Sequence, residues 1–107
     1  MAQELPFRYR WSCQVLYDGM TDFLDIQHRK IEVGRARGWR DPRFWVATAG
    51  NLNDFTIERE FETLQGLANE LHERQKDFEF MKLMRESYTH LVQGSVRTEI
   101  LELVESG

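Results

Sequence analysis

The chain has 107 residues, a length that predicts one domain over residues 1–107. Hydrophobic residues make up 41% and charged residues 30%, which excludes a disordered chain. The net charge is −4, and the acidic excess lies in residues 44–107, so we expect no nucleic-acid partner.

The first residues have neither a positive flank nor an apolar run, so we expect no secretory signal and a cytoplasmic protein. No stretch approaches the ~18 consecutive apolar residues of a membrane span, so we expect no membrane partner either. One cysteine, Cys13, rules out an intramolecular disulfide.

Residues 7–15 alternate strictly between two kinds of side chain, a period of two that predicts a strand. One face carries Phe7, Tyr9, Trp11, Cys13 and Val15, and the other carries Arg8, Arg10, Ser12 and Gln14. Because Cys13 points inward with its apolar neighbours, we expect it to be an inert core thiol.

A helix over about 21–34 should follow, with Thr21 as its cap and with Gly34 and Gly38 marking its end. Leu24 and His28 share its apolar stripe, so His28 can point toward the sheet. The basic loop after the helix runs to Arg43 and shows no phosphate-binding pattern.

Two further strands, 44–49 and 55–61, should form a hairpin through the turn-forming residues 50–54. A helical pattern then runs over 63–93 and falls out of step across residues 74–77. Asp77 can cap a new helix there, so we expect a break. The last strand should span 96–104.

The segment 72–76 begins like a zinc-protease helix, but Lys76 stands where the second histidine is needed. We therefore expect a solvated helix face and no metal site there. Three scattered histidines and one cysteine also predict that no metal, haem or flavin is bound.

The order strand, helix, strand, strand, helix, strand predicts an α+β, ferredoxin-like βαββαβ fold. Both helices should cover one face of a four-stranded antiparallel sheet, with the first and third strands central. Arg8 and Arg10 should then pair with Glu58 or Glu60 across the open face. That face is either solvated or closed by a second copy, and its carboxylates disfavour RNA binding.

Three groups of residues carry a family resemblance. They are the turn Gly50-Asn51-Leu52-Asn53, the helix positions Leu64, Leu67, Glu70 and Arg74, and the run Asp77-Phe78-Glu79-Phe80. Over about residues 44–104 the chain resembles the NIPSNAP-like family, a branch of the dimeric α/β barrel superfamily that also holds antibiotic-biosynthesis-type monooxygenases. The resemblance implies a homodimer or a larger assembly.

The chain departs from that family in the pocket: Ile57 and Arg59 stand where His and Trp are common, and Phe61 replaces a Tyr. We therefore expect a small-molecule-binding or assembly protein without demonstrable catalysis. The alternative is a cofactor-independent monooxygenase or isomerase that acts on a small hydrophobic carbonyl compound.

A ligand site, if there is one, should lie between the first helix and the apolar face of the sheet. Tyr9, Trp11 and Arg59 would come from the sheet and His28 from the helix, a set that suits a hydrophobic or anionic ligand. Both charged candidates also have a structural interpretation. His28 can be a hydrogen-bonded core residue, and Arg59 can reach solvent from a strand end.

Overall fold

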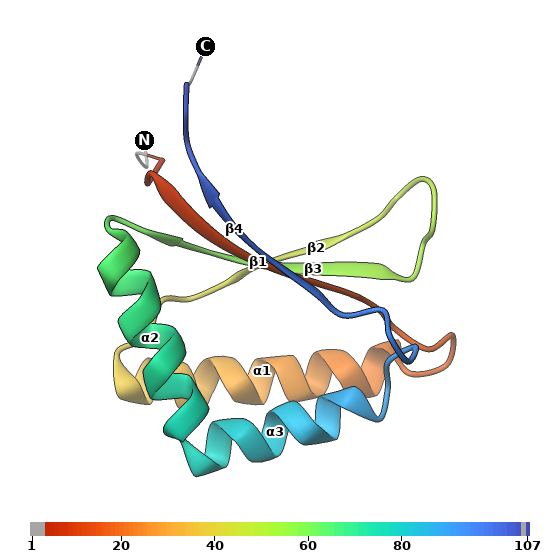
Figure 1. The fold of residues 1–107 in the computed structure, drawn as a ribbon. Helices are drawn as coiled ribbons and strands as arrows, with labels where there is room; N and C mark the ends of the chain where they lie inside the picture. The colour runs from red at the N-terminus through yellow and green to blue at the C-terminus, as the bar shows by residue number, and fades with distance from the viewer. Residues whose placement is uncertain (1–3, 106) are drawn as a thin grey trace.

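The computed structural model describes residues 4–105 and 107, and seven elements follow one another along the chain. They are β1 (Phe7–Gln14), α1 (Met20–Arg37), β2 (Arg43–Val46), β3 (Asp54–Phe61), α2 (Leu64–Lys76), α3 (Phe78–Tyr88) and β4 (Arg97–Glu102). The strands form one antiparallel sheet in the order β2-β3-β1-β4, and the helices cover one of its faces (Figure 1). The predicted ferredoxin-like α+β fold is confirmed.

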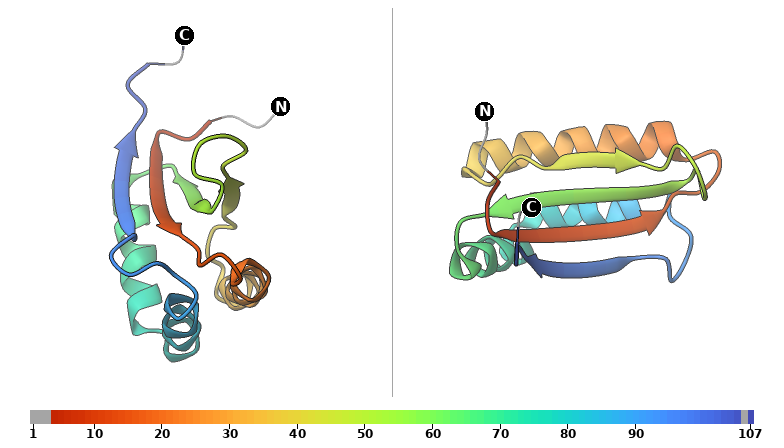
Figure 2. Two further views of the ribbon diagram at one scale, coloured as in Figure 1. Left: turned by 90° about the vertical axis from the view of Figure 1, so that its right-hand side faces the viewer. Right: turned by 90° about the horizontal axis from the view of Figure 1, so that it is seen from above.

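The central pair β1 and β3 follows the predicted alternation. Tyr9 lies opposite Arg59 and Trp11 opposite Ile57, so these side chains share the face covered by the helices. Figure 2 shows the four strands side by side from the open face, with α1 running along the β2 edge. Strand β1 ends at Gln14, one residue earlier than predicted.

The first helix is longer than the sequence predicts. It begins at Met20 without a side-chain cap, so Thr21 lies inside it, and it continues through Gly34 to Arg37. Gly34 lies inside the helix with the Trp39 side chain packed over it, and the Trp39 N–H donates to the Gly34 carbonyl at 2.9 Å. Gly38, with a φ of 78°, ends the helix in the left-handed conformation that favours glycine.

The predicted break in the second helical region is confirmed. Asp77 separates α2 from α3, and its Oδ1 accepts a hydrogen bond from the Phe80 N–H at 2.9 Å. The end of this region was predicted too late, since α3 stops at Tyr88 and Leu91 pairs with Val15 in an isolated bridge. The strand predicted over 44–49 also ends early, at Val46, and the last strand covers only 97–102.

Two apolar clusters form the core. One lies mainly between the sheet and α1 and contains Trp11, Cys13, Val15, Phe23, Phe55, Ile57 and Leu91. The other joins the helices and contains Ile26, Val33, Trp39, Phe80 and Leu83. Among the helices that the structure describes, none is both long and apolar enough to cross a membrane.

Candidate functional site: a buried cationic cluster

A lysine of α1 is buried where the two apolar clusters meet. The Lys30 residue is 6% exposed, and its Nζ lies 5.7 Å from the Trp11 ring centre and 5.3 Å from that of Phe80. Its only hydrogen bond within the described residues is to Gln27 Oε1, at 3.0 Å. Burial lowers the pKa of Lys30 to about 7, and the positive charges of Arg59 and Arg74 lower it further.

Two buried arginines share one carboxylate beside this amine. Arg59 comes from β3, and Arg74 and Glu70 lie one turn apart on α2. The Glu70 Oε2 atom is 3.9 Å from Arg59 Nε and 3.8 Å from Arg74 Nε, beyond hydrogen-bond length. Its other oxygen accepts the Arg40 backbone N–H at 2.7 Å, which holds the carboxylate toward the α1–β2 loop.

Several polar atoms of this cluster are left without a partner. Within the described residues, no hydrogen bond reaches Gln27 Nε2, Arg59 Nε, Glu70 Oε2, Arg74 Nε or Arg74 Nη2, although all are inaccessible to solvent. Buried polar groups are nearly always hydrogen-bonded, so five such atoms in one place are unusual. Both arginines respond to burial: desolvation lowers the pKa of Arg59 to about 10 and also lowers that of Arg74.

Aromatic rings surround the charged groups. The Arg74 guanidinium carbon lies 5.2 Å from the Tyr9 ring centre and 5.7 Å from that of Phe80, within the range of cation–π contact. Desolvation raises the pKa of Tyr9, while Arg74 and Arg59 act in the opposite direction. The cluster therefore combines positive donors with apolar walls, the make-up of a site for a small ligand that carries negative charge.

A groove on the surface shares Glu70 with this cluster. It has a volume of about 400 Å³ and lies between the α1–β2 loop and α2. Phe61, Gly66, Asn69 and Glu70 are among its lining residues. Glu70 thus belongs both to the groove and to the buried cluster, whereas neither Arg59 nor Arg74 lines the groove.

The structure brings together three of the four predicted site residues. Tyr9, Trp11 and Arg59 lie on the helix-facing side of the central strands, as predicted. His28 does not point toward them: it is exposed, with its ring centre 6.3 Å from that of Phe44. The stripe of α1 that faces the protein interior includes Phe23, Ile26, Lys30 and Val33, and His28 falls outside it.

Lys30 and Arg74 were missed as site residues. Residues 72–76 were expected to form a solvated face. Four of them are exposed, as expected, but Arg74 is buried and only 6% exposed. One signal was present: Leu67, Glu70 and Arg74 recur at helical spacing on the buried stripe of α2.

The one cysteine lies in the apolar core. Cys13 is buried, as predicted, and burial raises the pKa of its thiol to about 12, so it stays protonated and unreactive. Among residues 4–105 and 107, no group of three or more His, Cys, Asp or Glu side chains lies close enough together to hold a metal ion.

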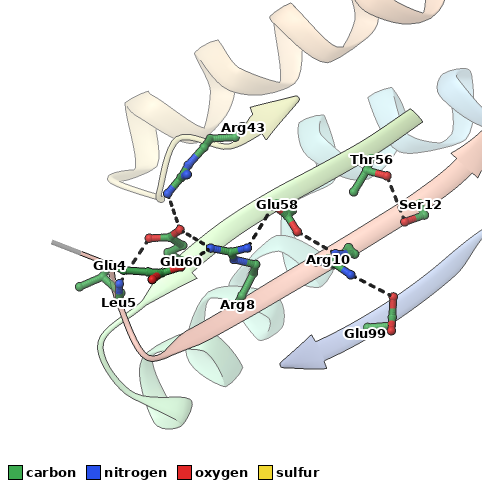
Figure 3. A network of polar contacts seen from close by, with 10 residues as sticks. All are labelled: Glu4, Leu5, Arg8, Arg10, Ser12, Arg43, Thr56, Glu58, Glu60 and Glu99. Carbon is green, nitrogen blue, oxygen red and sulfur yellow. Dashed lines mark hydrogen bonds and ion pairs between the residues drawn. The ribbon is translucent and has the colours of Figure 1, made fainter. Parts of the chain in front are cut away.

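The open face of the sheet carries the predicted ion pairs (Figure 3). Arg8 lies 2.8 Å from Glu60, and Arg10 Nε lies 2.7 Å from Glu58. Arg8 also reaches Glu58 at 3.6 Å, and Arg43 of β2 contacts Glu60. The predicted pairing of Arg8 and Arg10 with Glu58 or Glu60 is therefore confirmed, and the strand register places Arg8 opposite Glu60 and Arg10 opposite Glu58.

The architecture and strand order define an α+β protein of the ferredoxin-like class. No protein-family model and no curated protein matches the sequence. Solved structures do match: a NIPSNAP family protein from Agrobacterium tumefaciens superposes with a TM-score of 0.78 and 11% identity, covering 100% of this chain and 93% of that one. The chain therefore has the fold of NIPSNAP family proteins.

Two other solved structures have the same fold. An uncharacterized NIPSNAP domain protein from Burkholderia xenovorans gives a TM-score of 0.73 at 13% identity, covering 92% of this chain and 94% of that one. An antibiotic biosynthesis monooxygenase gives a TM-score of 0.71 at 11% identity, covering 92% of this chain and 99% of that one. At these identities the likeness concerns the fold, and function must be argued from the site.

Proposed function

We propose that this chain is a small-molecule-binding protein, cytoplasmic and homodimeric, whose ligand lies between α1, α2 and the covered face of the sheet. The observation that supports this proposal is that Arg59 and Arg74 have buried N–H donors for which no described residue provides an acceptor. Replacing buried ionic groups by apolar residues of similar size is often neutral or stabilising. A cluster of three cations in the interior is therefore poorly explained by stability alone, and ligand binding supplies a reason for it.

The proposed site keeps Tyr9, Trp11 and Arg59 and takes Lys30 in place of the exposed His28. Native mass spectrometry of the purified protein should find a co-purified small molecule, and a thermal-shift screen should find ligands that stabilise it. Arg59→Ala should lose that stabilisation and His28→Ala should keep it. A ligand that stabilises both variants as much as wild type would place the site elsewhere.

The homodimer rests on the open face of the sheet. Its Glu58 and Glu60 carboxylates are already paired with Arg10 and Arg8 within one chain, so this face can meet a second copy without leaving these two carboxylates unpaired. Trp45 points to the same face, opposite Thr56, and is 52% exposed. Light scattering at micromolar concentration should give twice the chain mass, and a monomer would contradict the proposal.

A second function is retained on one observation, the likeness to an antibiotic biosynthesis monooxygenase. In this alternative the chain is a cofactor-independent monooxygenase or isomerase for a small hydrophobic carbonyl compound. Oxygen uptake, or conversion of the co-purified molecule by the purified protein, distinguishes it from a binding protein. Turnover that is lost in Arg59→Ala would favour the enzyme, and binding without turnover would favour the binding protein.

A further inference from the structure

We infer that the ligand carries one carboxylate group, which Arg59 and Arg74 receive with Lys30 beside them as a third donor. The inference rests on the proposed function and names the chemical class of its ligand. It also adds two residues, Lys30 and Arg74, to the site. Three observations support it: the charge of the cluster, the buried donors that lack an acceptor and the surface groove that Glu70 lines.

The charge of the cluster is unbalanced. Three cationic side chains face one buried carboxylate, that of Glu70. Asp41 also acts weakly on Arg59, but it is at the surface, where Arg35 already binds it at 3.1 Å. One further negative charge in the interior would reduce the excess, because an uncompensated buried cation is unfavourable.

The free donors favour a planar acceptor with two oxygens. Arg59 Nε, Arg74 Nε and Arg74 Nη2 have no acceptor among the described residues, and Glu70 is too far from both arginines to accept from them. A guanidinium presents its N–H groups in a flat fork that matches a carboxylate. The rings of Tyr9 and Phe80 beside Arg74 would hold the apolar body of the same ligand.

The groups that face Lys30 decide how the site responds to pH. They are Arg59 from β3, Arg74 from α2, Cys13 and Trp11 from β1, Phe80 from α3 and Gln27 from α1. No carboxylate of the described residues is among them. A bound carboxylate would be the first negative charge beside this amine, so binding should take up a proton and weaken as the pH rises through neutrality.

The test compares matched carboxylates and amides on the whole protein by calorimetry. Benzoate, phenylacetate and cinnamate are each titrated against the corresponding neutral amide, with inorganic phosphate as a further anion. We expect the best carboxylate to bind at least tenfold more tightly than its amide and than phosphate. Its affinity should fall from pH 6 to pH 8.5, with proton uptake seen as a heat that depends on the buffer.

The variants locate the binding. Arg74→Met should lose at least tenfold in affinity for the carboxylate, and Arg59→Lys, which keeps the charge but loses the fork, should lose affinity while retaining the fold. Arg35→Met, at the exposed pair with Asp41, is the matched control and should bind as wild type does. Equal losses in the control, or none in the two site variants, would overturn the inference.

Two other results separate this inference from the proposed function. An amide that binds as tightly as its carboxylate, or phosphate that binds better than both, would overturn the carboxylate assignment and leave a small-molecule site. If none of the probes binds and the purified protein carries no small molecule, both the inference and the proposed function fail.

Discussion

Lys30→Met is the substitution that examines the buried amine most directly. Burial lowers the pKa of Lys30 to about 7 in the folded protein, whereas an unfolded chain keeps a lysine pKa of about 10.4. Between these two values the unfolded state binds more protons than the folded state. The contribution of Lys30 to the free energy of unfolding therefore rises with pH across this window.

The size of this stability change follows from the linkage between proton binding and unfolding. One pKa unit corresponds to about 1.4 kcal/mol, so Lys30 should add about 2 kcal/mol to the stability of the wild type between pH 7 and pH 9. Methionine has nearly the same length and no charge to desolvate. Lys30→Met should therefore be more stable than wild type at pH 6, and its advantage should shrink by about 2 kcal/mol between pH 7 and pH 9.

Urea unfolding followed by tryptophan fluorescence measures this difference at each pH. Comparing variant with wild type removes the titration of all other groups, including the Cys13 thiol. The exposed Lys82→Met is the matched control and should differ from wild type by the same small amount at every pH. A stability difference for Lys30→Met that does not change with pH would refute the assignment of a buried, easily deprotonated amine.

Three further predictions concern Glu70, the cap of α3 and the open face of the sheet. Glu70→Gln should lower the free energy of unfolding by about 3 kcal/mol, because among the described residues it removes the one buried carboxylate that lies beside both arginines; urea unfolding checks it, and a loss below about 1 kcal/mol would contradict it. Asp77→Ala should cost about 1 kcal/mol through loss of the α3 cap, whereas Asp18→Ala should cost almost nothing. Trp45→Glu should give a folded monomer by light scattering and circular dichroism, and an intact dimer would show that the open face is not the interface.

The sheet could be predicted from the sequence because its pattern is simple. In β1 every second residue is apolar, so a period of two predicted the covered face and placed Arg8 and Arg10 on the open face with Glu58 and Glu60. The break at Asp77 could also be predicted, because a capping residue stands where two apolar stripes fall out of step. These features depend on local sequence alone.

The site was only partly predictable, because its residues break the rule that places charge outside. On α1 the buried stripe includes the charged Lys30, so a search for apolar spacing chose Leu24 and His28 as the residues that face the sheet. Arg74 was assigned to solvent for the same reason. Its burial depends on Tyr9 and Phe80, which come from distant elements, and such tertiary contacts leave no local pattern in the sequence.

The central claim is that the buried cationic cluster is a binding site, and a crystal structure grown with phenylacetate tests it most directly. The account predicts that the carboxylate oxygens lie about 3 Å from the Nε atoms of Arg59 and Arg74. The phenyl ring should pack against Tyr9 and Phe80. A closed interior in which Glu70 alone binds both arginines, with phenylacetate absent or bound only at the surface, would contradict it.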